Sequence, residues 1–353
     1  MAKKIFRFIG IAILSLFSIF IIFIVYAQIT YYNPEQKLVL RESNSPDTIP
    51  VDSCLTALTW NIGYAGLGDN MDFFYDNGKK VRDTKGRTLE NLKGIKQFIA
   101  QNKQTNFILL QEVDADSKRT YHINEISAIA DTIKIQNVLG LNYNVNFVPI
   151  PPMEPMGKVI SGIITFTRFT PELSQRHGYP GKFSWPNRLF NLRRCMVANY
   201  YPTSNGKKLV VVNTHNSAFD NGSLKTQEIN YLKAFILEEY VNGNYVIVGG
   251  DWNQSPPDFP LETFGNNYKE PFFILTNIDS KFMPNNWTWA FDPTEPTNRY
   301  LNKPYTVGDN YTGILDFFLL SPNVSLQKVK TTNLQFRNSD HNPVSLSFRL
   351  KPD

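Results

Sequence analysis

The sequence predicts an α/β domain built on a mixed sheet. Short apolar segments with β-branched and aromatic residues recur between turn residues and have the length of strands, at residues 55–60, 107–110, 143–148, 159–166, 209–212, 245–248, 314–320 and 344–350. Two segments between them, 89–100 and 224–241, repeat apolar residues on one helical face. Strands that alternate with helices are typical of α/β domains, and consecutive strands without a helix between them favour a mixed sheet.

The composition supports a large folded domain and excludes several classes of protein. The 353 residues are 42% hydrophobic and 19% charged, which excludes a disordered, collagenous or coiled-coil chain. The net charge is +5, but Lys3, Lys4 and Arg7 supply three of these charges, so the remainder is nearly neutral and attracts polyanions weakly. Two cysteines, Cys54 and Cys195, exclude a disulfide scaffold and a cysteine zinc site, and two unpaired thiols are favoured over a single disulfide.

The first predicted element is an apolar segment, residues 8–27, that contains no charged residue. About twenty residues with a rise of about 1.5 Å each span the hydrocarbon core of a bilayer. Basic residues precede this segment, so the positive-inside rule places residues 1–7 in the cytoplasm and the following domain across the membrane. Two alternatives remain: a signal peptide cleaved after Ala27, and a buried core helix, which the unbroken apolarity disfavours.

Residues 28–50 are predicted to be a linker. From Tyr31 to Pro50 the chain is polar, is interrupted by Pro34 and Pro46, and lacks helical or alternating apolar periodicity. The globular domain is then expected at residues 51–353. It is expected to be one domain, because no second linker and no repeat of fixed period follows.

Acidic, amide and histidine side chains follow the predicted strands, where an α/β sheet opens its ligand crevice. They are Asn61, Gln111-Glu112, Asn213-Thr214-His215-Asn216, Asp251-Trp252-Asn253, Asp316 and Ser339-Asp340-His341-Asn342. Each cluster alone has a plain structural explanation, as a helix cap, a turn or a satisfied histidine. Together, carboxylate and amide oxygens suit Mg²⁺, and two of the four histidines lie among them. This combination indicates phosphoryl transfer to an activated water.

Six motifs in this order resemble those of the endonuclease/exonuclease/phosphatase superfamily, which includes deoxyribonucleases, abasic-site endonucleases, inositol polyphosphate 5-phosphatases and Mg²⁺-dependent sphingomyelinases. The motifs are TWNI, LLQEVD, NTHNSA, GGDWNQSP, ILDFFLLS and SDHNPV, and they cover residues 55–350. The resemblance implies a four-layered α/β/β/α sandwich, with two mixed sheets packed face to face, helices outside and the site at one end. It also implies phosphoester hydrolysis with Mg²⁺ or Mn²⁺ as cofactor.

The resemblance also assigns the metal ligands and the residues that act on water. Asn61 and Glu112 are expected to hold the divalent cation, with Asp340 as a further ligand. Asp251 and Asn253 are expected to orient or activate the attacking water. One metal ion and two metal ions are both compatible with this set.

Two histidines complete the implied machinery. His341, oriented by Asp316, is expected to act as general base or to stabilise the transition state, because a carboxylate fixes the imidazole tautomer and favours its protonated form. His215 is expected to bond a non-bridging phosphate oxygen. How Asp251 and His341 divide the proton transfers stays open.

Other residues are expected at the edge of the site. Ser161-Gly162 and Thr288-Trp289 are predicted to form walls of the site, and Arg299 either meets a phosphate or lies on the surface. The aromatic segment 287–291 either dips into a membrane interface or forms a core strand.

The substrate is not fixed by the resemblance. We expect a membrane-anchored phosphodiesterase or phosphohydrolase that acts on a lipid or another extracytoplasmic phosphoester, because an anchor concentrates membrane substrates around the domain. His215 resembles the deoxyribonuclease and sphingomyelinase branches, so an extracytoplasmic nuclease is the alternative. A third reading is a catalytically inactive anchored binding protein, which the intact set of candidate residues disfavours. Monoester and diester substrates are not distinguished.

The sequence also carries an indication of cellular location. Asn253-Gln254-Ser255 is an N-glycosylation sequon at a candidate site residue, and a glycan there would block the cleft. This disfavours a eukaryotic secretory route and favours a single-pass protein of a bacterial cytoplasmic membrane. We expect the chain to be a monomer.

Overall fold

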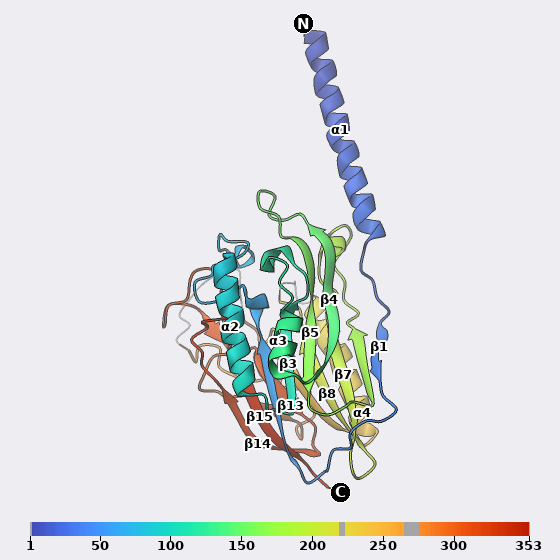
Figure 1. The fold of residues 1–353 in the computed structure, drawn as a ribbon, viewed down its shortest axis with the longest axis vertical. Coiled ribbons are helices and arrows are strands. Elements are labelled where there is room, and N and C mark those ends of the chain that lie inside the picture. The colour runs from blue at the N-terminus through green and yellow to red at the C-terminus, as the bar shows by residue number, and fades with distance from the viewer. Residues whose placement is uncertain (1, 219–222, 265–274, 353) are drawn as a thin grey trace.

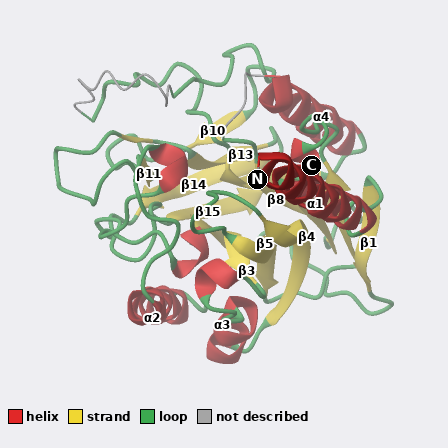
Figure 2. Ribbon diagram, turned by 90° about the horizontal axis from the view of Figure 1, so that it is seen from above, coloured by secondary structure: helices red, strands yellow, loops and turns green. Residues whose placement is uncertain are grey.

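The computed structural model describes residues 2–218, 223–264 and 275–352. Two sheets pack face to face, and helices cover their outer faces (Figure 2). The helices are α1 (Ala2–Ile29), α2 (Lys85–Gln101), α3 (Glu125–Ile133) and α4 (Ser223–Val241). Short 3-10 helices lie at Gly63–Ala65, Phe74–Asp76, Lys118–Thr120 and Asn187–Phe190.

The first sheet has seven strands in the order β1-β6-β7-β8-β9-β13-β10. Its strands are β1 (Lys37–Glu42), β6 (Leu173–Gly178), β7 (Cys195–Pro202), β8 (Lys208–His215), β9 (Tyr245–Asp251), β10 (Thr288–Ala290) and β13 (Asp316–Leu320). Neighbouring strands are antiparallel except β8 and β9, which are parallel. The carboxyl ends of β8 and β9 therefore lie at the same edge of the sheet.

The second sheet has six strands in the order β14-β15-β2-β3-β5-β4. Its strands are β2 (Cys54–Asn61), β3 (Phe107–Asp114), β4 (Gln136–Val148), β5 (Gly157–Thr167), β14 (Val324–Thr331) and β15 (Val344–Leu350). Here β2 and β3 are the parallel pair, so their carboxyl ends also meet at one edge. A two-stranded ribbon, β11 (Asn298–Arg299) with β12 (Thr312–Gly313), stands apart from both sheets.

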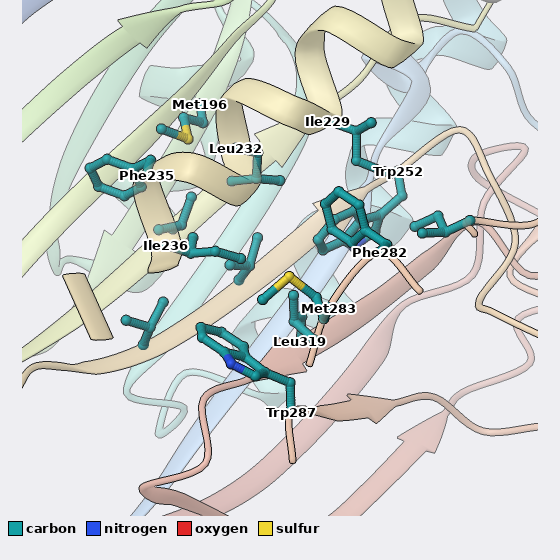
Figure 3. Packing of buried hydrophobic residues seen from close by; sticks show 14 of the residues in the cluster. Met196, Ile229, Leu232, Phe235, Ile236, Trp252, Phe282, Met283, Trp287 and Leu319 are labelled. Carbon is teal, nitrogen blue, oxygen red and sulfur yellow. The ribbon is translucent and has the colours of Figure 1, made fainter. Parts of the chain in front are cut away.

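Three apolar interfaces hold the layers together. Between the sheets, Phe107 and Phe348 of one sheet belong to the same buried cluster as Phe318 of the other. On the outer face of the seven-stranded sheet, Leu232 and other residues of α4 pack toward Met196, as Figure 3 shows. A further cluster buries α2 and α3 against the outer face of the six-stranded sheet. The predicted four-layered sandwich of two mixed sheets is confirmed.

Helix α1 stands away from the sandwich (Figure 1). Among the described helices it is the one that is long and apolar enough to cross a membrane, with a mean hydropathy of 3.0, and its side chains are exposed except near its C-terminal end, where Ala27 is buried. The alternative of a buried core helix is therefore wrong. The structure leaves open the choice between an anchor and a cleaved signal sequence.

All eight predicted strand segments overlap strands, and both predicted helices are present as α2 and α4. The prediction of a linker at 28–50 is wrong in part. It contains β1, which pairs antiparallel with β6, and Ile49, which is fully buried between the sheets. The side chains on both faces of β1 are largely exposed, so the strand shows no alternation of apolar and polar residues in the sequence.

The structure decides two alternatives that the sequence left open. Trp287 is buried in the apolar cluster under α4, so segment 287–291 belongs to the core and not to a membrane interface. Cys54 and Cys195 are both unpaired, as favoured from the sequence.

Candidate active site

A cavity of about 290 Å³ opens where the parallel strand pairs of both sheets end. Its polar part contains every residue to which the sequence analysis assigned a catalytic or metal-binding role, except Asp316: Asn61, Glu112, His215, Asp251, Asn253, Asp340 and His341. Its other wall is aromatic and apolar, with Tyr64, Phe73, Tyr143, Met156, Phe183, Leu192 and Tyr300. The cavity can therefore hold a molecule that has both a charged and an apolar portion.

The ends of the strands deliver the polar side chains to this cavity. His215 and Asp251 are register partners at the ends of β8 and β9. Before Asp251, Gly250 has a φ of +155°, and a Cβ there would lie 1.9 Å from the carbonyl oxygen of Thr214. Only glycine permits this close approach of the two strands. On β3, the pairing with β5 is interrupted at Glu112, which has a φ of +52° and lines the cavity.

His341 and Asp316 form a buried pair that joins the two sheets. His341 Nδ1 donates to Asp316 Oδ2 over 2.7 Å, and both side chains are buried. Asp316 begins β13 of the seven-stranded sheet, whereas His341 precedes β15 of the six-stranded sheet. Burial alone would lower the pKa of His341, but the carboxylates of Asp316, Asp340 and Asp251 raise that pKa well above its usual value. These carboxylates therefore favour the protonated form of His341.

The other ring nitrogen of His341 faces the cavity residues. The side-chain amide nitrogen of Asn298 lies 3.0 Å from Nε2. The carboxylates of Asp251 and Asp340 each approach Nε2 to 3.8 Å. Nε2 thus lies among polar groups that line the cavity. This geometry supports the predicted role of Asp316 as the residue that orients His341.

Asp251 lies at the centre of the polar residues. Its Oδ2 accepts a hydrogen bond from Asn61 Nδ2 over 3.0 Å and lies 3.4 Å from His215 Nε2. Its Oδ1 accepts from the backbone N–H of Asn253 over 2.9 Å. The Asn253 amide in turn donates to the carbonyl oxygen of Asn216 over 2.8 Å. Two hydrogen bonds, from Asn61 and from the backbone of Asn253, therefore hold the carboxylate in place.

His215 has the opposite charge state from His341. Burial, Arg194 and His341 lower the pKa of His215 well below its usual value, so its ring is neutral at pH 7. Its Nε2 lies 3.8 Å from Glu112 Oε1, and its Nδ1 has no hydrogen-bond partner among the described residues. A neutral imidazole beside these acids can donate one hydrogen bond without adding charge.

The donor set fits a hard divalent cation. Burial, followed by the charge of Asp340, raises the pKa of Glu112, and burial likewise raises that of Asp340. A cation between them would relieve this excess of negative charge, and carboxylate and amide oxygens are the ligands that Mg²⁺ prefers. The Asn61 oxygen accepts one bond from the Gly63 N–H over 3.0 Å and retains a second lone pair for a ligand.

A second group of possible ligands lies beside the first. One ligand atom each of Asp251, Asp316 and His341 lies within 4.8 Å of the others. The Asp316–His341 hydrogen bond already occupies Nδ1 of this group. The set Asn61, Glu112 and Asp340 therefore leaves more oxygen atoms free for a cation.

Two expectations about the edge of the site need correction. Arg299 does not lie on the surface but is buried and lines the cavity. It is 1% exposed and donates to the carbonyl oxygens of Gly68 and Met71, so it holds a loop in place. Thr288-Trp289 does not line the cavity, because Trp289 packs on Trp252 within the outer apolar cluster. Ser161 does line the cavity, as expected.

Sequence reasoning missed several cavity residues. Arg119 makes a two-pronged hydrogen bond to Asp114 and lies 3.5 Å above the Tyr64 ring. Asp114 ends the LLQEVD motif and was the one available signal for this pair. Arg194, also at the cavity, has a buried guanidinium nitrogen without a partner among the described residues. Asn298 lies in no recognisable motif, so nothing in the sequence singles it out.

The two-sheet sandwich, with acidic, amide and imidazole side chains at its strand ends, has the fold of a phosphoesterase family. A family model described as "Endonuclease/Exonuclease/phosphatase family" matches residues 58–341, and the chain belongs to this family. Members of the family are phosphoesterases and nucleases. Among curated proteins, no significant match is found.

Solved structures show the same fold at low sequence identity. An endonuclease/exonuclease/phosphatase from Beutenbergia cavernae is 16% identical with a TM-score of 0.54, over 84% of this chain and 72% of that one. The human Nocturnin catalytic domain with bound sulfate is 14% identical with a TM-score of 0.53, over 87% and 98%. ANGEL2, described as a 2',3'-cyclic phosphatase, is 16% identical with a TM-score of 0.53, over 88% and 100%.

Proposed function

We propose that this chain is a divalent-metal-dependent phosphodiesterase that hydrolyses its substrate with an activated water. The observation that carries the proposal is the Asp316–His341 pair, which presents an imidazolium to the cavity beside Asp251. Asp251, fixed by Asn61 and Asn253, is placed to orient or deprotonate water. His341 then stabilises charge or protonates the leaving oxygen, and His215 donates to a non-bridging oxygen.

The metal ligands in this proposal are Asn61, Glu112 and Asp340. A Mg²⁺ or Mn²⁺ ion there supplies a Lewis acid for the phosphate and lowers the pKa of bound water. In this proposal Asp251 and Asn253 do not bind the metal, and they orient or activate the attacking water. The positions of Glu112 and Asp340 at the same cavity as His341 support this division.

The experiment that tests the proposal is an assay of phosphodiesters, with and without Mg²⁺. The panel contains a phospholipid, a single-stranded oligonucleotide and the soluble bis(4-nitrophenyl) phosphate. Turnover should require the metal, and Glu112→Gln should weaken metal binding by at least about tenfold, because one formal charge is lost from the site. Glu238→Gln, an exposed site on α4, is the matched control.

Three outcomes of this panel discriminate among the candidate functions. Undiminished turnover in excess EDTA would refute the metal-dependent mechanism. A preference for the oligonucleotide would establish the nuclease alternative. No turnover on any diester, with metal still bound, would support the inactive binding protein.

We further propose that α1 anchors the chain in a bacterial cytoplasmic membrane, with residues 1–7 inside and the catalytic domain outside. The length and apolarity of α1, its lack of burial and the basic residues before it support this. A reporter fused after Asp353 should therefore be active on the extracytoplasmic side. Cytoplasmic reporter activity would overturn this orientation, and a soluble product that begins at Gln28 would favour a cleaved signal peptide.

A further inference from the structure

We propose that two loops beside the anchor form a membrane-binding face, which seats the mouth of the cavity against the bilayer so that the substrate is the phosphoester of a membrane lipid. The loops are the β4–β5 connection, residues 149–156, and the β6–β7 connection, residues 179–194. The membrane-binding face consists of both loops together with Phe147 at the end of β4. The part of this inference that names a lipid substrate rests on the proposed phosphodiesterase function.

The first observation is the apolar surface that these loops expose to solvent. Met153 is 97% exposed and Trp185 is 57% exposed, and Phe147 and Ile150 are exposed as well. Single exposed apolar residues are ordinary, but four large ones on two adjoining loops mark an interaction surface. Tryptophan is enriched where proteins meet the membrane interface, because its ring is amphipathic.

The second observation is the contact between these loops and α1. The ring of Phe23 stacks on Phe190 with centroids 5.5 Å apart, and meets Phe147 edge-on at 6.0 Å. Tyr26 Oη accepts a hydrogen bond from Asn146 Nδ2 over 3.0 Å. Figure 1 shows α1 leaving the domain beside the end of β4.

These contacts place the face at the level of the bilayer surface. Phe23 lies within the apolar stretch 8–27, about 6 Å before its end at a rise of about 1.5 Å per residue. When this stretch spans the membrane, Phe147 and Phe190 must lie at the interface, because they touch Phe23 directly. The remainder of the two loops is carried to the same depth. The position of α1 therefore identifies the bilayer as the partner of this face.

The third observation is that the same loops line the cavity. Met156 and Phe183 belong to its apolar wall. Met156 is three residues from the exposed tip at Met153, a chain length of at most about 11 Å. Trp185 is two residues from Phe183. A lipid that leaves the interface would therefore meet the apolar wall with its hydrocarbon portion and the polar residues with its phosphate.

Fluorescence quenching tests the membrane-binding face without any reference to catalysis. Trp60, Trp252 and Trp287 are buried and Trp289 is packed in the core, so Trp185 is the tryptophan exposed at this face. The full chain is reconstituted in vesicles of phosphatidylcholine and phosphatidylglycerol whose acyl chains are brominated near the headgroup. We expect strong quenching in the wild type and loss of most of that quenching in Trp185→Phe. Equal quenching in both proteins, or none, would overturn the proposed face.

An activity ratio tests the lipid substrate. We compare hydrolysis of vesicle phospholipid with hydrolysis of bis(4-nitrophenyl) phosphate by the full chain in the same vesicles. Met153→Glu should lower this ratio by about tenfold, because a charge replaces an inserted apolar side chain. Val241→Glu is the matched control, since Val241 is 82% exposed. It ends α4 shortly before the first residue of β9, whereas Asp251 is the last residue of that strand.

The outcomes separate this inference from the proposed function. An unchanged ratio in Met153→Glu, or soluble diester turnover without phospholipid turnover, would overturn the lipid substrate while the phosphodiesterase stands. If neither substrate is hydrolysed, the proposed function fails and the lipid substrate fails with it. The quenching experiment still decides whether the face binds the membrane.

Discussion

The layer between the two sheets differs sharply from one end to the other. On β3 the inward side chains are Phe107 and Leu109, followed by Gln111 toward the cavity. On β13 the order from the far end is Leu320, Phe318 and then Asp316. The far half is an apolar core, and the near half is a network of buried polar groups that ends in the candidate active site.

The polar half is held together by hydrogen bonds between the sheets. Gln111 Nε2 donates to Asn213 Oδ1 over 2.8 Å, and Asn213 Nδ2 donates to the carbonyl oxygens of Leu110 and Ile164. Because side chains alternate along a strand, the same face that supplies the core also supplies His215, two residues after Asn213. The site is therefore an extension of the core, with rigidity provided by directional bonds in place of apolar packing.

The largest expected effect is on catalysis in the polar half. His341→Ala should lower kcat by about 10²- to 10⁴-fold, the range for a lost acid–base group. Asp316→Asn should lose much of this by itself, because the amide no longer stabilises the imidazolium. If the two residues act as a unit, the double variant should be little worse than His341→Ala. Turnover of a phosphodiester by the four proteins measures this, and full multiplication of the two losses would show independent roles.

The pH profile sharpens the same prediction. Asp316 and the other carboxylates raise the pKa of His341, so the active imidazolium persists above the usual histidine pKa and is lost as pH rises through the raised value. Asp316 contributes most to the raised pKa of His341. Asp316→Asn should therefore lower this pKa and move the alkaline limb of the kcat profile to lower pH. An alkaline limb at the same pH in both proteins would contradict the charge state assigned to His341.

The next effect is on stability in the apolar half. Phe318→Ala should lower the free energy of unfolding by about 3–5 kcal/mol, because a fully buried aromatic ring leaves a cavity between the sheets. Chemical denaturation measures this loss, and kcat per folded molecule should change little. Val241→Ala, at an exposed position, is the control. A loss below about 1 kcal/mol would mean that the far half does not carry the stability of the sandwich.

The smallest effect is expected from a hydrogen bond between the two sheets within the polar half. Gln111→Leu should reduce the free energy of unfolding by about 1–3 kcal/mol, since Asn213 loses the donor to its buried oxygen. Replacing both residues with leucine removes both polar groups and should recover part of this loss. Denaturation of the single and double variants gives the coupling energy. Additive losses would show that the pair is not a connected network.

The sequence predicts most strands of both sheets, including the edge strand β4, but it misses the edge strands β1 and β14 and the interior strands β6 and β7. The segments around Phe107 and Val248 are unbroken apolar runs because both faces of these strands are covered. β1 and β14 are edge strands with many exposed side chains, so their pattern does not differ from that of a polar loop. β1 becomes a strand by pairing with β6, which lies more than a hundred residues later in the chain, and a local sequence pattern does not contain that information.

The candidate site was predictable where a strand end supplies the residue. His215 and Asp251 end strands that are evident from apolar periodicity, and the family motifs add Asp316 and His341. Asn298 and the burial of Arg299 were not predictable, because the ribbon β11 is two residues long and its position depends on contacts with distant loops. The charge states of the two histidines depend on surroundings that only the folded chain brings together.

The edge strand β1 couples α1 mechanically to the sandwich. Only seven residues, 30–36, separate α1 from β1, a reach of at most about 25 Å. Hydrogen bonds to β6 lie across the strand, with Lys37 opposite His177 and Glu42 opposite Leu173. A pull on the anchor acts along β1 and loads these bonds together in shear, so they do not open one at a time. With α1 in a bilayer as proposed, lateral drag or bending of the membrane would be transmitted into the seven-stranded sheet that carries His215, Asp251 and Asp316.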